Sequence, residues 1–431
     1  MREERGLGVG SKKKRLKNMK YEDYINLNYK PSRKDLICEF FLKTKGQHDL
    51  KRTAGGVAAE SSIGTWTETS TLKPYMVKLG AKVFSFKKKG KHGANLKIAY
   101  PNELFELGNV PNIMSSIAGN IFGMKDVEGL RLNKIIFPKN IVKSFKGPKY
   151  GIQGVRKITK VKNRPLVGTI VKPKLGLNTI DHAKVAYDAW IGGCDVVKDD
   201  ENLSSQSFNK FKNRLNATLK LRDKAEKITG ERKMYMINVT AETKEMLKRA
   251  QLVEDSGNEY IMVDIVTSGW SALQTLRDAN FKLVLHAHRA GHAAFDKNLE
   301  HGINMRVIAQ LTRLIGLDQL HVGTAVGKMF ESHEEVVDNV EALTEPLYGV
   351  KKVFPVSSGG LEPLMIPDLY KIFGKDVIMQ FGGGIHGHPQ GTLRGAIAAR
   401  QALDATLKGI SLKQYAKKHK ELAGALGKWK A

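Results

Sequence analysis

The chain has 431 residues, 41% of them hydrophobic, so it can bury a large core in two or three domains, and no run of 18 or more apolar residues offers a membrane span. Its 71 Lys and Arg against 43 Asp and Glu give a net charge of +28, which raises nucleic acid as a partner, yet the excess is spread along the chain and is more typical of a solvated surface or of a general attraction for anionic substrates. Only two cysteines occur, Cys38 and Cys194, both in apolar contexts, which indicates a reduced, cytoplasmic protein without a disulfide framework.

Residues 1–20 are basic and lack an apolar segment, so they are predicted to be a disordered leader rather than a secretory signal. Residues 21–148 are predicted to form an α+β, ferredoxin-like domain with helices on one face of an antiparallel sheet. Its expected strands are Asp35–Leu42, Ala81–Phe86 and Asn95–Tyr100, and its expected helices are Asp49–Ser61 and Asn112–Phe122. The lysine-rich segment Lys87–Gly93 is expected to be a hairpin tip or loop.

The pattern of apolar and polar residues changes at Gly147–Gly151, and a second domain is predicted at residues 149–431. Eight apolar, strand-like runs recur there, at Leu166–Val171, Asp195–Lys198, Met234–Val239, Tyr260–Val266, Lys282–Leu285, Gln319–Val322, Val353–Val356 and Val377–Gln380. Helical, charge-bearing stretches separate most of them, such as Asn209–Ile228, Thr243–Ser256, Met305–Leu314 and Ser332–Leu343. This alternation over roughly 260 residues predicts a (β/α)₈ barrel, of α/β class. A doubly wound open sheet is the alternative, but no Gly-x-Gly-x-x-Gly motif follows the first strand.

Chemistry in such barrels gathers where the strands end. Six of the eight predicted strands end in reactive or glycine-rich groups, namely Lys172–Lys174, Lys198–Glu201, His286–Arg289, His321–Thr324 with Gly327 and Lys328 beyond it, Ser357–Gly360 and Gly382–Gly384. A structural protein would give no reason for this coincidence, so the strand ends indicate an enzyme.

The second of these strand ends lies in the segment Asp195–Asn202, which carries three consecutive carboxylates after a lysine. Strand alternation puts Lys198 and Asp200 on one face, and the following turn can bring Glu201 beside them. Two carboxylates there make a hard-oxygen site suited to Mg²⁺. Because an ammonium would repel the cation, Lys198 is expected to be neutral or converted to an anion by reaction with CO2. A solvated charge run after a strand is the plainer alternative.

Two strand ends favour a phosphorylated substrate. Gly359-Gly360 and Gly382–Gly384 follow strands seven and eight, where barrels commonly bind phosphate through backbone N–H groups, although ordinary strand-to-helix turns would have the same pattern. Arg289 and His321 are expected across the barrel mouth, where they would hold a second phosphate. The substrate would then be a bisphosphate with a short carbon chain between its phosphates.

The remaining groups suit proton transfer. Lys172 and Lys174 flank the predicted metal site and would polarise or protonate an oxygen. His288 is a candidate proton carrier, whereas His286, one alternation away, is expected to be the structural member of the pair.

Seven ordered motifs resemble the large subunit of ribulose-1,5-bisphosphate carboxylase/oxygenase (Rubisco), from about Tyr21 onward. They are Glu60–Trp66, Gly119–Gly123, Gly168–Leu177, Lys198–Asn202, His286–Arg289, Gly323–Lys328 and Phe381–Gly384. The segment Gly384–Pro389 looks most like the archaeal, form III type. The resemblance implies Mg²⁺-dependent carboxylation, and oxygenation, of ribulose 1,5-bisphosphate to 3-phosphoglycerate by way of an enediolate.

The resemblance also implies a role for each matching residue. Lys198 would be carbamylated by CO2, and the carbamate, Asp200 and Glu201 would bind Mg²⁺. Lys172, Lys174 and His288 would serve proton transfer and oxygen polarisation, and Lys328 would stabilise the incoming carboxylate from a mobile loop. The substrate-binding residues would be Arg289, His321, Ser358, Gly360, Gly382 and Gly383, with Gly359 beside them.

The family's active sites form between subunits. Glu60, Thr65, Trp66 and Asn120 would therefore be supplied by the second chain of a homodimer, which is expected to assemble further without a small subunit. Ile170 departs from the threonine of many plant-type members, and neither the basic leader nor the insert Lys87–Lys91 has an assigned role.

Two other functions compete with the carboxylase. A Rubisco-like protein would enolise a related sugar phosphate without fixing CO2, but such relatives usually lose part of the carboxylation set, and Lys328, Glu60 and Asn120 are all present here. A basic protein associated with nucleic acid would need a clustered positive face and salt-sensitive binding.

Overall fold

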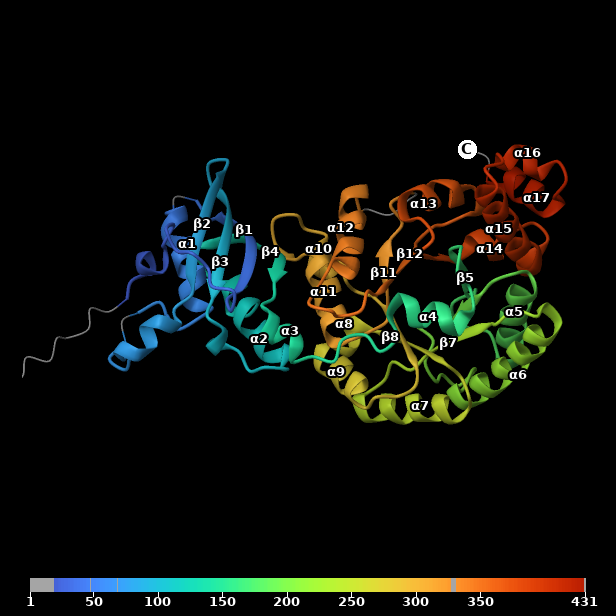
Figure 1. Cartoon of the computed structure of the whole chain (residues 1–431), viewed down its shortest axis with the longest axis horizontal. Coiled ribbons are helices and arrows are strands. Elements are labelled where there is room, and N and C mark those ends of the chain that lie inside the picture. Colours follow the sequence, from blue (N-terminus) through green and yellow to red (C-terminus); the bar gives the residue numbers. More distant parts are fainter. Residues whose placement is uncertain (1–18, 47, 68, 327–330, 430–431) are drawn as a thin grey trace, which may run out of the picture.

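The computed structural model describes residues 19–46, 48–67, 69–326 and 331–429, so most of the predicted leader, as well as Gly327 and Lys328, lies outside the described residues. A small sheet domain and a larger barrel lie side by side (Figure 1). No helix in these described ranges is both long and apolar enough to cross a membrane.

The first domain has the β-α-β-β-α-β order of the predicted ferredoxin-like fold, which adds a last strand to the five elements expected from the sequence. Its elements are β1 (Leu36–Thr44), α1 (Leu50–Glu60), β2 (Lys82–Lys89), β3 (Gly93–Tyr100), α2 (Val110–Ile117) and β4 (Val127–Ile136). It also contains the 3-10 helices η1 (Tyr21–Tyr24), η2 (Pro74–Leu79), η3 (Asn102–Leu104) and η4 (Asn120–Gly123) and the helix α3 (Lys139–Lys143). The strands pair in the antiparallel order β4-β1-β3-β2, and β4 had no counterpart among the predicted strands.

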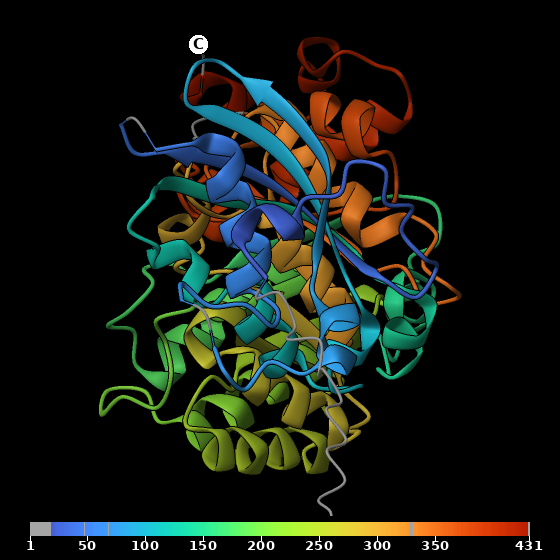
Figure 2. The ribbon, with the colours of Figure 1, turned by 90° about the vertical axis from the view of Figure 1, so that its left-hand side faces the viewer.

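Two segments of this domain differ from the prediction. The helix expected over residues 112–122 ends at Ile117, and Asn120 begins the separate 3-10 helix η4. Only glycine fits at the intervening position 119, where a Cβ would lie 2.1 Å from the Ser115 carbonyl oxygen. The lysines expected in a hairpin tip instead extend β2, and only residues 90–92 form the turn of the projecting β2–β3 hairpin (Figure 2). Because β2 is an edge strand, exposed lysines there discourage pairing with other chains.

The second domain is a closed barrel of eight parallel strands, which confirms the predicted barrel and excludes the open sheet. The strands are β5 (Leu166–Ile170), β6 (Val196–Lys198), β7 (Met234–Asn238), β8 (Tyr260–Asp264), β9 (Val284–His288), β11 (Gln319–Gly323), β12 (Phe354–Ser358) and β13 (Ile378–Phe381). The helix α4 (Gly151–Thr159) precedes these strands. The helices between and after them are α5 (Thr179–Ile191), α6 (Phe211–Thr229), α7 (Thr243–Asp255), α8 (Ile265–Ser268), α9 (Trp270–Asp278), α10 (Ala293–Asp296), α11 (Met305–Ile315), α12 (His333–Thr344), η5 (Pro363–Met365), α13 (Ile366–Phe373), α14 (Gly383–His386), α15 (Gly391–Leu407), α16 (Leu412–Ala416) and α17 (Lys420–Lys428).

Strand alternation decides which barrel side chains face the interior. Val196 belongs to the apolar cluster inside the barrel, whereas Val197 packs in the outer cluster beneath the helices. Continuing this alternation turns Lys198 inward at the carboxyl end of β6. At the opposite end, α4 closes the barrel, because Ile152 and Val155 join the interior cluster. The barrel mouth at the carboxyl ends of the strands is therefore left for chemistry.

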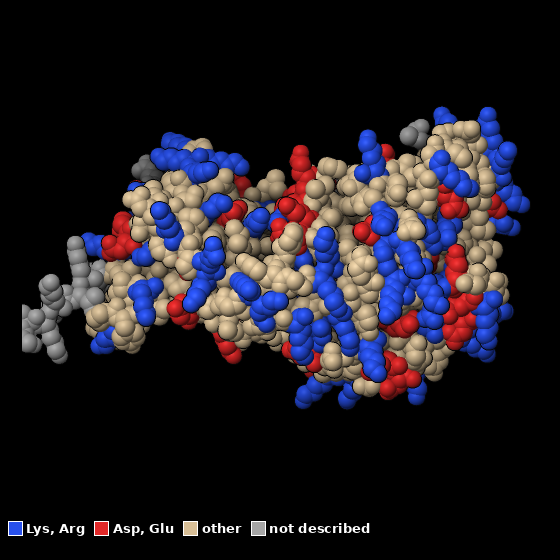
Figure 3. Space-filling model, viewed as in Figure 1, with Lys and Arg blue, Asp and Glu red and all other residues tan. Residues whose placement is uncertain are grey.

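Backbone and side-chain contacts join the two domains. The short strand β10 (Gly302–Ile303), which follows β9 in the chain, pairs with β4 of the first sheet. Arg131 of β4, which is buried, donates to the carbonyl oxygen of Asp296. On the face shown in Figure 3, Lys and Arg are scattered over both domains among Asp and Glu, as expected for a solvated surface.

Candidate active site

A cavity of about 470 Å³ lies at the carboxyl ends of the barrel strands. Ten of the predicted site residues line it, namely Lys172, Glu201, His288, Arg289, His321, Ser358, Gly359, Gly360, Gly382 and Gly383. A larger cavity of about 1070 Å³ lies around α4 at the other end of the barrel, and its lining contains none of them. The chemistry predicted from the sequence therefore gathers in the smaller cavity.

The predicted metal-binding segment forms a compact group of lysines and carboxylates. Lys198 is fully buried; its Nζ donates to the Asp199 carbonyl oxygen at 2.7 Å and lies 4.0 Å from Glu201 Oε2. Burial lowers the pKa of Lys198, against the opposing pull of Glu201 and other nearby carboxylates. Asp200 accepts a 2.6 Å hydrogen bond from Lys172 Nζ; burial would raise the pKa of Asp200, but Lys172 outweighs it and the pKa is lowered.

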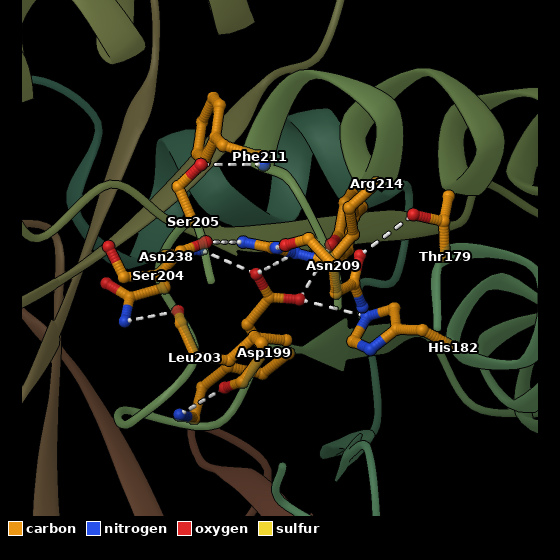
Figure 4. Close-up of polar contacts among 12 residues, drawn as sticks. Thr179, His182, Asp199, Leu203, Ser204, Ser205, Asn209, Phe211, Arg214 and Asn238 are labelled. Atoms are coloured by element: carbon orange, nitrogen blue, oxygen red, sulfur yellow. Dashed lines mark hydrogen bonds and ion pairs between the residues drawn. The ribbon is translucent and has the colours of Figure 1, made fainter. Parts of the chain in front are cut away.

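Asp199, between these residues, turns away from the cavity into a buried polar network (Figure 4). Its carboxylate accepts hydrogen bonds from Arg214 Nε at 3.0 Å, the Tyr235 hydroxyl at 2.6 Å and the Asn238 backbone N–H at 3.1 Å, and it lies 3.1 Å from His182 Nε2. The three consecutive carboxylates thus have different roles. Asp199 anchors the end of the strand, whereas Asp200 and Glu201 remain beside Lys198. This excludes a simple solvated charge run.

His288 lies between two carboxylates. Its Nδ1 is 2.7 Å from Asp264 Oδ1 and its Nε2 is 3.6 Å from Glu201 Oε2. Burial and the charge of Lys198 lower the pKa of His288, although Asp264 opposes them. The short contact to a carboxylate favours a proton on Nδ1, which leaves Nε2 of the neutral ring as a proton acceptor facing the cavity.

A chain of hydrogen bonds runs beside it from Gln319 to Ser358. His286 Nδ1 lies 2.8 Å from Gln319 Oε1, His286 Nε2 lies 2.8 Å from His321 Nε2, and His321 Nδ1 lies 2.5 Å from Ser358 Oγ. Burial lowers the pKa of both His286 and His321 well below the usual value, so both rings are neutral and one can donate to the other. His286 is fully buried, whereas His321 and Ser358 reach the cavity.

The groups predicted to bind phosphate stand along an arc of the barrel. Arg289 follows β9 and Gly382 follows β13, and β11 and β12 lie between these strands in the barrel order. Gly359 and Gly360 have φ values of +111° and +68°, which favour glycine, and Gly383 opens α14. A Cβ at Gly384 would lie 2.0 Å from the Leu361 carbonyl oxygen, so close packing requires glycine there.

Several predicted residues are absent from the cavity lining, among them Lys198 and Asp200, which are buried behind it. Lys174 is exposed, with its Nζ 3.5 Å from Asn202 Oδ1. Glu60, Thr65, Trp66 and Asn120 belong to the first domain and are absent from the described lining. Glu60 accepts a 2.7 Å hydrogen bond from the Tyr21 hydroxyl, and the side chain of Trp66 is 81% exposed. Lys328 lies outside the described residues.

Sequence reasoning missed two residues that hold the site in place. Asp264 orients His288, and the Asn238 amide donates 3.0 Å hydrogen bonds to the carbonyl oxygens of Glu201 and Leu203. They end β8 and β7, the two strands for which no functional end was predicted. The available signal was a single polar residue near the end of each apolar run, because barrel chemistry gathers at that position.

The donor set fits Mg²⁺ only in part. Asp200 and Glu201 supply the hard oxygen ligands that Mg²⁺ prefers. Across the described part of the chain, no three His, Cys, Asp or Glu side chains are grouped so as to hold a metal ion. A third anionic ligand from the buried Lys198 would complete the set.

Comparisons with known proteins agree with this geometry. The models of the ribulose bisphosphate carboxylase large chain match residues 23–141, for the N-terminal domain, and residues 151–429, for the catalytic domain. A ribulose bisphosphate carboxylase of Methanosarcina mazei is 54% identical over 426 residues, which cover 94% of this chain and 99% of that protein.

Solved structures give the same result. The octameric Rubisco of Pyrococcus horikoshii in complex with sulfate ion superposes with a TM-score of 0.93 at 44% identity, covering 96% of this chain and 99% of that one. The dimeric archaeal Rubisco of Hyperthermus butylicus superposes with a TM-score of 0.89 at 45% identity, covering 95% and 99%. These findings confirm the predicted likeness to archaeal members. The chain therefore belongs to the family of ribulose bisphosphate carboxylase large chains and is an enzyme of that family.

Proposed function

We propose that the cavity binds ribulose 1,5-bisphosphate with Mg²⁺, and that the chain carboxylates and oxygenates it by way of an enediolate, carboxylation giving 3-phosphoglycerate. The observation that carries this proposal is the fully buried Lys198 beside Asp200 and Glu201, because Glu201 also lines a cavity with cationic and glycine-rich walls. A buried ammonium has no use in a cation site, whereas a lysine that reacts with CO2 supplies the missing anionic ligand.

The environment of Lys198 suits this reaction. Only the neutral amine attacks CO2, and burial lowers the lysine's pKa, so a larger fraction is neutral than for a solvated lysine. The nitrogen forms the new bond to the carbon of CO2 and releases one proton, leaving a carbamate. Its oxygens, with those of Asp200 and Glu201, would hold Mg²⁺, which when bound stabilises negative charge developing on substrate oxygens.

The other residues act on the substrate. His288 Nε2, held by Asp264, would accept and return a proton beside the substrate carbonyl, and Lys172 Nζ would polarise an oxygen. We also assign Lys174 and Lys328 to proton transfer and to stabilisation of the new carboxylate. Both would join the site with substrate bound.

The phosphates would occupy the two ends of the arc. Arg289, His321 and Ser358 would bind one by charge and hydrogen bonding, and Gly359, Gly360, Gly382 and Gly383 would bind the other through backbone N–H groups.

The functional unit would be a homodimer with shared sites. Glu60, Thr65, Trp66 and Asn120 lie outside the cavity of their own chain, and Trp66 is largely exposed, so they are available to a second copy. The related structures named above are described as dimeric and octameric.

The direct test is incorporation of labelled bicarbonate into an acid-stable product with ribulose 1,5-bisphosphate and Mg²⁺. Incorporation should require both, and should vanish in Lys198→Ala while persisting in Lys184→Ala, a matched change at an exposed lysine. Exchange of the substrate C3 proton without incorporation would instead support an enolase and refute carboxylation.

A further inference from the structure

Glu331, shortly after β11, places its carboxylate beside the predicted phosphate ligand Arg289. Glu331 Oε1 lies 2.5 Å from Arg289 Nη2 and 3.8 Å from His292 Nε2, and the side chains of Glu331 and Arg289 are 3% and 6% exposed. The intervening Gly323 makes room, because a Cβ there would lie 3.3 Å from Arg289 Nη2 and 3.6 Å from the carboxyl carbon of Glu331. The pair is therefore built into the barrel wall rather than formed at the surface.

This ion pair is incomplete. Glu331 Oε2 and Arg289 Nη1 are both buried, and neither has a hydrogen-bond partner among the described residues. A guanidinium and a carboxylate pair best through two parallel hydrogen bonds, and burying two ions is repaid only when the geometry is complete. The contact thus pairs the two charges, but it leaves one donor, Arg289 Nη1, and one acceptor, Glu331 Oε2, without a hydrogen bond.

The same guanidinium faces the cavity. The side chain of Arg289 lines it together with His292, His321 and Ser358, so this arginine belongs to a wall rich in donors. A phosphate there offers three oxygens and up to two negative charges. It can pair both ends of the guanidinium and also accept from the Ser358 hydroxyl, which a single carboxylate cannot do.

We propose that Glu331 is an internal anion that occupies the phosphate position on Arg289 until a phosphoryl group displaces it, and that it thereby sets the affinity of the site for phosphorylated ligands. The inference rests on the proposed function in one respect only, namely that the phosphoryl group bound by Arg289 belongs to the sugar substrate. When a phosphoryl group displaces Glu331, the single contact between Arg289 and the carboxylate is replaced by contacts to several phosphate oxygens. The Glu331 carboxylate is then released toward water. Anions with fewer oxygens or less charge gain less from the exchange, so the pair also favours phosphoryl groups over them.

The test measures binding of inorganic phosphate to the purified protein by calorimetry. Glu331→Gln keeps the shape of the side chain and removes its charge, so phosphate should bind about tenfold more tightly, within the usual range of coupling between two sites. Glu334→Gln is the matched control, because it removes one exposed carboxylate from the same segment, and its affinity should equal that of the unaltered protein. Arg289→Met should lose this binding. Equal affinities in Glu331→Gln and the unaltered protein would overturn the proposal, as would retention of binding in Arg289→Met.

If Glu331→Gln is poorly folded, thermal unfolding with and without phosphate provides a second test of the proposal. Without phosphate it should melt below the unaltered protein, since Arg289 loses its partner, and with phosphate it should regain more stability than the unaltered protein does. Glu331→Asp, which keeps the charge on a shorter side chain, should bind phosphate with intermediate affinity. A purely structural role would lower the midpoint equally with and without phosphate and would refute the proposal. None of these readouts uses carboxylation, so failure of the proposed function would leave them interpretable.

Discussion

The buried network around Asp199 offers a quantitative test of how the catalytic segment is held. Asp199→Asn keeps the shape of the side chain but removes its charge, while Arg214, whose side chain is 0% exposed, keeps its own. Breaking a buried ion pair from one side typically costs about 3–5 kcal/mol, because the remaining charge stays buried and uncompensated. The Asn carbonyl still accepts one hydrogen bond, so we expect a loss near the lower end, about 3 kcal/mol of unfolding free energy.

The assay is denaturant unfolding at one fixed protein concentration, with Asp223→Asn as the matched control. Asp223 also pairs with an arginine, Arg222, at 2.7 Å, but its side chain is 55% exposed, so its loss should cost less than about 1 kcal/mol. Carboxylase activity should fall with Asp199→Asn and not with the control, because Lys198 and Asp200 are its direct neighbours in the chain.

The pH dependence gives a second check. Burial would raise the pKa of Asp199, but the charge of Arg214 and hydrogen bonds from His182 and Tyr235 outweigh it and hold the pKa far below its usual value. A carboxyl with a depressed pKa contributes stability that is fully present above its unfolded pKa of about 3.9 and is lost as the pH falls toward the folded value. The difference between the unaltered protein and Asp199→Asn should therefore be constant near neutral pH and shrink below about pH 4. A difference under about 1 kcal/mol at neutral pH, or one that does not shrink in acid, would refute this account of the network.

Four further experiments address the proposed site. Mixing inactive Glu60→Gln and Lys198→Ala chains should restore activity through hybrid sites, and proven hybrids without activity would exclude sites shared between subunits. Lys328→Met should abolish carboxylation yet leave partial exchange of the substrate C3 proton, whereas loss of both steps would show that this lysine is not specific to gas addition. Tyr21→Phe removes the 2.7 Å hydrogen bond to Glu60 and should lower kcat about tenfold, as expected for one lost bond to a charged group; an unchanged kcat would show that the bond does not position Glu60. Preincubation with bicarbonate and Mg²⁺ should raise the initial rate, faster at mildly alkaline pH because the Lys198 amine must lose its proton first; full activity with Lys198 unmodified by mass measurement would contradict the carbamate.

The sequence by itself determined the barrel strands and the groups at their ends, although it did not reveal β4 of the first domain. All eight barrel strands occur where apolar runs predicted them, because burial on both faces of a parallel strand imposes a continuous apolar pattern that is local in the chain. The polar residues and glycines at the ends of those runs are local too, and ten of them line one cavity. Where the prediction failed, as in the helix that ends at Ile117, the chain turns at a position, Gly119, where the close approach of the Ser115 carbonyl oxygen leaves room only for glycine.

Only the tertiary structure decided how those groups are paired. The hydrogen bonds from Lys172 to Asp200 and between His288 and Asp264 join residues 28 and 24 positions apart, at the ends of different strands. The residues of the pair Arg289 and Glu331 are 42 positions apart. From the sequence alone, Asp199 could equally have joined Asp200 and Glu201 beside Lys198. Its pairing with Arg214 is seen only in the folded structure. Alternation along a strand determines whether a side chain faces the inside or the outside of the barrel. The residue with which that side chain pairs depends on which strands are adjacent in the closed barrel and on their register. Strand adjacency and register are properties of the whole fold.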